Sequence, residues 1–133
     1  MSLAPLTGSW LLLAAYLGLP GGERVNYFGP NPTGRMILDP GGTMIVLLTR
    51  AERSGDPDAL FGSMLAYTGR FVADATSFVT HVNAAWVPAW VGTAQTRHYS
   101  IDGDRLTIRT PPGPHPAHPG GEVSAVLEWV REG

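Results

Sequence analysis

Glycine, proline and aspartate residues divide this chain into short apolar segments, and this spacing of turn-forming residues limits the folds that the chain can adopt. The 133 residues include 17 glycines and 12 prolines, which form turns between the pieces. Short apolar runs between turns are typical of antiparallel barrels and sandwiches. We expect one all-β domain, residues 1–133, with about eight to ten strands, a number that can close into a small barrel. The expected strands cover residues 8–17, 22–28, Arg35–Asp39, Thr43–Arg50, 68–74, 77–86, 93–101, 104–110 and 121–132.

Residues 54–67 predict a helix. Asp56 is placed to cap it, Pro57 suits its first position, and Asp58 lies in the first turn, where the helix dipole favours a carboxylate. The apolar residues that follow recur at helical spacing and predict one buried face, formed by Leu60, Phe61, Met64 and Leu65. The proline-rich segment 111–121 is expected to be a loop without regular structure.

Composition and charge exclude several classes of partner. The formal net charge is −2, and no basic run offers a surface for nucleic acid or for an anionic membrane. The apolar run from Trp10 to Leu19 is shorter than the ~20 residues that span a bilayer, and it predicts a buried strand. The absence of cysteine excludes disulfides, thiolate metal sites and a cysteine nucleophile, and we expect a cytoplasmic protein.

The clearest local signal is a hairpin over residues 93–110. Asp102 and Gly103 both tolerate a positive φ, as the favoured two-residue turn requires, so Ile101 is expected opposite Asp104. In the second strand apolar residues alternate with polar ones and mark the buried face. That face also carries polar cross-strand partners, in the expected pairs Tyr99–Leu106, Arg97–Ile108 and Gln95–Thr110. The interior is therefore expected to be polar in places.

Two interpretations of the inward Arg97 stay open. A buried arginine is unfavourable unless it is paired or lies in a wet cavity. In the first interpretation Arg97 closes one end of the barrel and binds backbone carbonyls or an acid. Two-residue alternation points Glu128 outward if Leu127 and Trp129 point inward; only as an inward residue would Glu128 neutralise Arg97. In the second it lines a ligand cavity, with Gln95 and Tyr99 as further convergent polar groups.

Other segments carry a family pattern, and they read TGSW, YFGPNPTGRMILDPGGTM, AYTGRFVAD, VTHV, WVGTAQTRHYSIDGDRLTIRTPP and SAVLEWVR. Together they resemble the lipocalin-like domain family of small microbial proteins over nearly the whole chain. The resemblance implies an up-and-down antiparallel, lipocalin-like (calycin-type) β-barrel with an internal cavity. It also implies that Trp10 packs at the closed end under Arg131. The segments before the helix and at residues 73–77 are shorter than is usual in the family, which implies a smaller lid. Nitrobindin-type barrels share the Gly-x-Trp start and would make a histidine a haem ligand; otherwise no cofactor is expected.

His81 is the candidate general base or hydrogen-bond donor. If residues 74–76 form a three-residue loop, His81 lies opposite Gly69, and the glycine leaves space for a ligand. A two-residue loop turns His81 outward, and the alternative to a functional role is a structural or surface histidine. His115 and His118 lie in the proline-rich segment, where two histidines alone do not make a stable metal site, so no metal is expected.

Other aromatic and apolar residues are placed to contact a ligand. Tyr67 would present its hydroxyl to the cavity, and Trp86 and Trp90 would lie at the barrel rim, as would Tyr27. The expected ligand-binding residues are Gln95, Tyr67, Trp86, Trp90, Phe71 and Ile108. The alternative for each ring is a place in the core.

These candidates support three hypotheses about function. The first is a module that binds a small, largely hydrophobic molecule in the barrel cavity. The second, by analogy with other lipocalin-like barrels, is a cofactor-independent isomerase or cyclase acting on a hydrophobic biosynthetic intermediate, with His81, Arg97 and Tyr99 as catalytic residues. The third is a filled barrel without a ligand. The expected partner is a small apolar molecule, and a homodimer is a further candidate.

Overall fold

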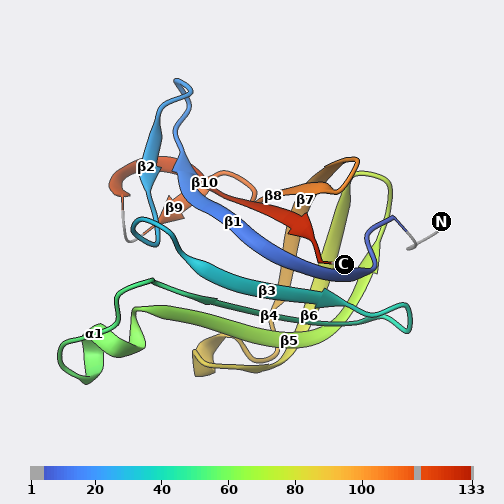
Figure 1. The fold of residues 1–133 in the computed structure, drawn as a ribbon, viewed down its shortest axis with the longest axis horizontal. Coiled ribbons are helices and arrows are strands. Elements are labelled where there is room, and N and C mark those ends of the chain that lie inside the picture. Colours follow the sequence, from blue (N-terminus) through green and yellow to red (C-terminus); the bar gives the residue numbers. More distant parts are fainter. Residues whose placement is uncertain (1–4, 116–117, 133) are drawn as a thin grey trace.

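Strand β1 (Gly8–Gly18) pairs with three other strands and closes the sheet on itself (Figure 1). The computed structural model of the protein describes residues 5–115 and 118–132. There, β1 pairs along its first half with β3 (Thr33–Leu38) and along its second half with β2 (Arg24–Asn26). Its other edge pairs with β10 (His118–Arg131), and this ladder completes a barrel.

Eight of the described strands form this antiparallel barrel, in the order β1-β3-β4-β5-β6-β7-β8-β10, so the expected all-β lipocalin-like fold is confirmed. β2 and β9 are additional strands that pair with β1 and β10. The other strands are β4 (Thr43–Thr49), β5 (Met64–Ala73), β6 (Ser77–Ala85), β7 (Ala94–Asp102), β8 (Arg105–Arg109) and β9 (Gly113–His115). A short helix, α1 (Pro57–Phe61), precedes β5, and a 3-10 turn, η1 (Pro88–Trp90), connects β6 to β7.

Strand β4 illustrates how the side chains divide between the core and the solvent. Met44, Val46 and Leu48 are buried, whereas Ile45 and Leu47 between them are exposed. This two-residue period places one face of the strand inside the barrel and the other face in water.

Trp10 and Arg131 close one end of the barrel. The Trp10 side chain is fully buried, and the guanidinium carbon of Arg131 lies 4.1 Å from the centroid of its ring. The same guanidinium donates hydrogen bonds of 2.8 Å to the carbonyl oxygens of Pro5 and Thr7. Gly8 has a φ of 132°, and a Cβ there would lie 2.7 Å from Arg131 Nη1, so this position favours glycine. The expected contact between Trp10 and Arg131 is confirmed.

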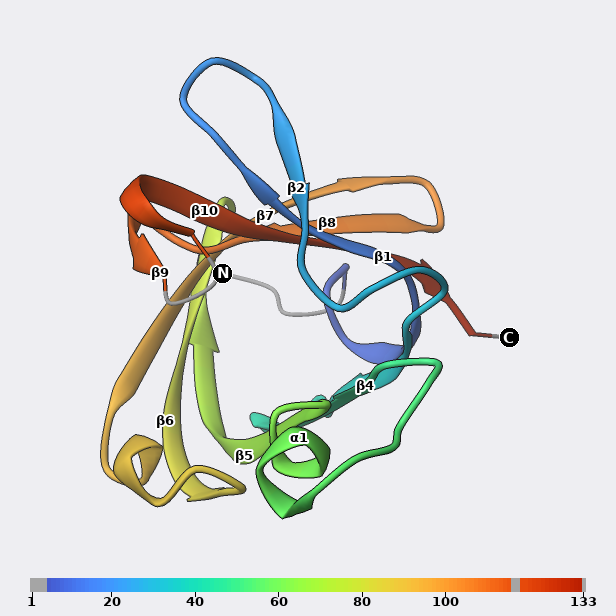
Figure 2. The same ribbon diagram turned by 90° about the vertical axis from the view of Figure 1, so that its left-hand side faces the viewer.

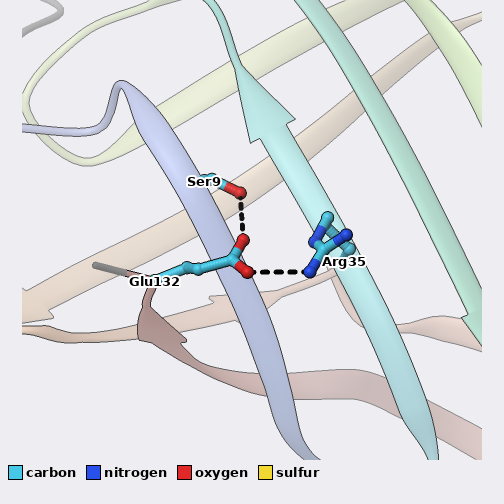
Figure 3. A network of polar contacts seen from close by, with 3 residues as sticks. All are labelled: Ser9, Arg35 and Glu132. Atoms are coloured by element: carbon cyan, nitrogen blue, oxygen red, sulfur yellow. Dashed lines mark hydrogen bonds and ion pairs between the residues drawn. The ribbon is translucent and has the colours of Figure 1, made fainter.

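Ser9, Arg35 and Glu132 link β1, β3 and the segment after β10 on the outer surface (Figure 3). Ser9 Oγ donates a hydrogen bond of 2.7 Å to Glu132 Oε1, and Arg35 Nη2 lies 2.7 Å from Glu132 Oε2. The Ser9 hydrogen bond and the Arg35 charge lower the pKa of the Glu132 carboxyl group. Because the ion pair is exposed and screened by water, it contributes little to stability.

Helix α1 is much shorter than the predicted segment 54–67. Its start agrees with the sequence, because Asp56 Oδ1 accepts a hydrogen bond of 2.9 Å from the Ala59 amide. Met64 and Leu65, however, belong to β5 and pair with residues of β4, and α1 has no buried residue. The expected buried helix face is therefore wrong. Strand pairing satisfies the backbone groups of Met64 and Leu65, whereas a short isolated helix is marginally stable.

The β7–β8 hairpin turns one residue later than expected. Gly103, with a φ of 62°, is the first of the two turn residues, a position at which type II′ turns favour glycine. Tyr99 therefore pairs with Ile108 and not with Leu106, so the expected register is wrong by two residues. An even shift keeps every side chain on its own face, and Arg97 remains on the inner side.

The segment 111–121 is not a loop throughout, which corrects the prediction. Within it, Gly113 of β9 pairs with Val123 of β10, and the backbones of His115 and His118 pair with each other. Proline is tolerated in an edge strand such as β9, because one side of that strand needs no backbone donor. The side chains of His115 and His118 lie outside the described part of the structure.

A bulge in the β5–β6 pairing brings two backbones unusually close. The register shifts between Thr68 and Gly69, and Gly69 pairs with Val82. A Cβ on Gly69 would overlap with the carbonyl oxygen of His81. Only glycine fits this approach without movement of one strand.

We expect Gly69→Ala to lower the free energy of unfolding by about 3 kcal/mol, because a strand must shift to admit the methyl group. Gly113→Ala is the matched control, since a Cβ there meets no atom within 4 Å. Urea unfolding followed by tryptophan fluorescence measures both variants. A Gly69→Ala protein as stable as the wild type would contradict the bulge geometry.

Asp74 organises the turn between β5 and β6. Its carboxylate accepts hydrogen bonds from the amides of Thr76 (2.9 Å) and Ser77 (2.8 Å), and these bonds lower the pKa of the carboxyl group. The Asp74 amide donates to the Ser77 carbonyl oxygen at 2.9 Å, which leaves Ala75 and Thr76 as a two-residue loop.

A carboxyl group whose pKa falls on folding stabilises the native state above its unfolded-state pKa. That contribution is lost as the pH falls through the native pKa. Asp74→Asn keeps an acceptor oxygen but does not ionise. We expect its urea midpoint to lie below that of the wild type at neutral pH and to approach it as the pH falls through the lowered native pKa of the Asp74 carboxyl group. Asp102→Asn, at the β7–β8 hairpin, is the control, and a midpoint difference for Asp74→Asn that is independent of pH would contradict this role.

Candidate functional site

A cavity of about 170 Å³ lies inside the barrel. Strands β3 to β8 and β10 each contribute at least one residue to its wall. Tyr27, which follows β2, also lines it, and Leu65 of β5 lies shortly after α1 in the sequence. Both elements lie at the end of the barrel that faces the viewer in Figure 2. Trp10, by contrast, is not part of the cavity wall.

The cavity wall is mostly apolar. Met36 and Met44 bring two flexible thioethers to it, which adapt readily to the shape of a ligand. The other apolar members are Val46, Leu65, Phe78, Trp90, Ile108, Ala125, Leu127 and Trp129. The polar members are Tyr27, Tyr67, Arg97 and Thr110. Such a wall suits an apolar molecule with a small number of polar groups.

Arg97 supplies the positive charge in the wall. Its side chain is half-buried, Nη1 donates a hydrogen bond of 2.9 Å to the Thr96 carbonyl oxygen, and Nη2 donates to Gln95 Oε1. Among the described residues, no carboxylate lies within ion-pair distance of Arg97. Glu128 instead accepts a hydrogen bond of 3.1 Å from the Tyr16 hydroxyl, so a neutralising role for it at Arg97 is wrong.

Two tyrosines share the cavity with Arg97. Burial raises the pKa of Tyr27; the nearby Arg97 charge acts in the opposite direction, and Tyr67 acts in the same direction. Tyr67 is buried, and its ring meets that of Trp90 edge to face at 5.5 Å between centroids. Thr110 Oγ1 accepts a hydrogen bond of 2.9 Å from the Ala125 amide. The polar groups of the wall are therefore a guanidinium and hydroxyls.

His81 lies outside the barrel, so its assignment as a catalytic residue in the cavity is wrong. The two-residue loop after Asp74 pairs His81 with the exposed Arg70, whereas Gly69 pairs with Val82. A one-residue change in loop length reverses the face on which a side chain lies. His81 consequently faces solvent and could not ligate a haem in the cavity.

Tyr99 and Gln95 lie on the inner face of β7 but do not line the cavity. The Tyr99 hydroxyl donates a hydrogen bond of 2.6 Å to the Asp74 carbonyl oxygen, and burial raises its pKa. This bond anchors the β5–β6 turn, so a catalytic role for Tyr99 in the cavity is wrong. Gln95 acts through Arg97, whose guanidinium it helps to orient.

Phe71 and Trp86 also lie outside the cavity wall, and their assignment as ligand contacts is corrected. Phe71 is buried in the core against Phe78, with 6.2 Å between ring centroids. Trp86 stacks on Phe61 of α1 at 5.2 Å, and its Nε1 donates a hydrogen bond of 3.0 Å to the Phe61 carbonyl oxygen. Trp86 also meets Trp90 edge to face at 5.0 Å. Trp86 therefore connects α1 to Trp90, which does line the cavity.

Of the expected ligand-binding residues, the structure brings Tyr67, Trp90 and Ile108 to the cavity wall, together with Arg97. Met36, Met44 and Trp129 also line the cavity but were not predicted from the sequence. Two-residue alternation along a strand indicates that such residues point into the barrel. Which of them border empty space depends on packing between strands that are distant in sequence.

Among the residues whose side chains the structure describes, 5–114 and 121–132, no group of three or more histidine, aspartate or glutamate side chains is arranged to hold a metal ion. In the same residues, no helix has the length and apolar character needed to cross a bilayer.

The fold and its cavity agree with a comparison to known protein families. A family model described as a lipocalin-like domain matches residues 7–132, which is nearly the whole chain. No curated protein matches the sequence. A lipocalin-like barrel with an internal cavity is suited in general to binding small molecules. The chain belongs to the lipocalin-like domain family.

Proposed function

We propose that the protein binds a small, largely hydrophobic molecule in the barrel cavity, with Arg97 orienting the polar end of the ligand. The observation that carries this proposal is the position of a half-buried guanidinium, without a carboxylate partner among the described residues, in an otherwise apolar wall. Specific ligand sites commonly combine apolar surfaces with a small number of convergent polar groups.

The cavity volume limits the size of the ligand. An apolar cavity of about 150 Å³ in another protein holds benzene, whereas drug-sized ligands occupy about 300–1,000 Å³. With about 170 Å³, this cavity suits one ring or a short branched chain. A larger molecule would need displacement of wall residues, for which Met36 and Met44 are the most adaptable.

The polar groups favour binding over an isomerase or cyclase activity. A cofactor-free isomerisation needs a group that moves a proton at the substrate. His81 faces solvent, and the Tyr99 hydroxyl is held by Asp74. Arg97 remains able to polarise a carbonyl group, but a guanidinium group is a hydrogen-bond donor and a poor base. Binding is therefore the function that this geometry supports best.

A variant that fills the cavity tests the proposal. Ala125→Phe places a ring in the wall, and we expect it to abolish the binding of benzene, because the volume is then occupied. Amide NMR spectra recorded during a benzene titration measure this binding in the full chain. Ala84→Phe, on the exposed side of β6, is the matched control and should bind as the wild type does.

Urea unfolding verifies that both variants are folded, and Leu127→Phe is the second cavity variant if Ala125→Phe is not. Native mass spectrometry of the freshly purified protein provides an independent test, in which a retained small organic mass is expected. A wild-type protein that binds neither benzene nor any copurifying molecule would overturn the proposal.

A further inference from the structure

The cavity wall has an unbalanced charge. Arg97 is its one cationic side chain, and no aspartate or glutamate of the described residues lines it. The residues outside the description, 1–4, 116–117 and 133, contain no aspartate or glutamate in the sequence. The positive charge must therefore be balanced by solvent or by what enters the cavity.

The hydrogen bonds of Arg97 leave much of its binding capacity unused. A guanidinium has five N–H donors, and the bonds to the Thr96 carbonyl and the Gln95 amide engage two of them, both with neutral acceptors. Thr96 and Gln95 belong to the same strand as Arg97, so both of these hydrogen bonds orient the guanidinium from within β7. A cation that is already oriented loses little conformational freedom when it binds an anion.

Other carboxylates near the barrel have partners elsewhere. Glu128 accepts the Tyr16 hydroxyl, Asp74 accepts the turn amides, and Glu132 pairs with Arg35. Recruitment of any of them to Arg97 would break those contacts. None of these three carboxylates is therefore available to take the place of an anionic ligand at Arg97.

The other residues of the cavity wall indicate which kind of apolar group the ligand carries. Five of the residues that line the cavity are aromatic: Tyr27, Tyr67, Phe78, Trp90 and Trp129. Aromatic rings pack favourably against other rings in offset or edge-to-face arrangements, and the two methionine sulfurs also favour aromatic neighbours. Burial keeps the pKa of Tyr27 above its usual range, so its phenol stays neutral at neutral pH and adds no competing negative charge.

We infer that the preferred ligand is a small aromatic monocarboxylate, with its ring among the aromatic residues of the wall and its carboxylate on Arg97. This inference rests on the proposed function of the cavity and names the class of molecule that it takes. The carboxylate receives charge-assisted hydrogen bonds from the guanidinium donors that the protein leaves unused. Because the wall has no opposing charge, a neutral or cationic molecule of equal size gains no such interaction.

Three probes of similar size separate these contributions in the full chain at neutral pH. Benzoate carries the ring and the charge, benzamide carries the ring with a neutral polar group, and benzene carries the ring alone. We expect benzoate to bind at least about tenfold more tightly than benzamide, measured by NMR titration, and added salt to weaken benzoate binding selectively.

Variants assign the preference to one residue. Arg97→Met should reduce the affinity for benzoate to that for benzamide while benzene binding persists. Arg109→Met, which removes an exposed arginine from the neighbouring strand β8, should keep the full preference. If Arg97→Met does not fold, the ratio of the two affinities in the wild type still tests the inference.

The possible results distinguish the inference from the proposed function. If benzene and benzamide bind and benzoate binds no better, the ligand class is wrong and the apolar binding function stands. If benzoate remains preferred in a folded Arg97→Met protein, the role of Arg97 is wrong. If none of the three probes binds the wild type, the proposed function itself fails.

Discussion

The ladder between β1 and β10 joins strands from the two ends of the sequence, from the Trp10–Arg131 pair to the Gly18–Ser124 pair. Without it, both strands would expose an unpaired edge, and water would reach the inner faces of all the others. Completion of the ladder encloses the space on which seven strands converge and brings Trp10 beneath Arg131. The cavity is thus a product of closure, since its wall residues meet only when the first and last barrel strands are paired.

Turn residues and two-residue alternation were sufficient to predict most of the strands and the inner face of β7. These are local properties, because a strand's side chains alternate whatever its neighbours are. The assignment of Arg97 and Ile108 to the interior survived a register error for that reason. The Trp10–Arg131 contact, implied by family resemblance, required no detailed register.

The predictions that were wrong concern properties of a strand that depend on its turns and on the strands with which it packs. The face of His81 depended on the length of one turn, and the hydrogen bonds of Asp74 decided it. The Tyr99 hydroxyl finds its acceptor in a turn that lies 25 residues away in sequence. Helix α1 is shorter than predicted because Met64 and Leu65 pair with β4. The helical spacing of apolar residues gives no information about that strand pairing. Cavity residues such as Trp129 were missed because empty space is a result of packing across the whole barrel.

The closed end and the cavity use different residues. Arg131 stacks on Trp10 and binds the carbonyls of Pro5 and Thr7, and neither Arg131 nor Trp10 lines the cavity. The two sets nevertheless share one core, because Trp10 pairs with Met36 and is buried in the same cluster as Phe78 and Trp129, and these three residues line the cavity. A substitution that reshapes the cavity wall therefore also changes the core in which Trp10 is buried, so the choice of ligand and the closure of the barrel are coupled through packing.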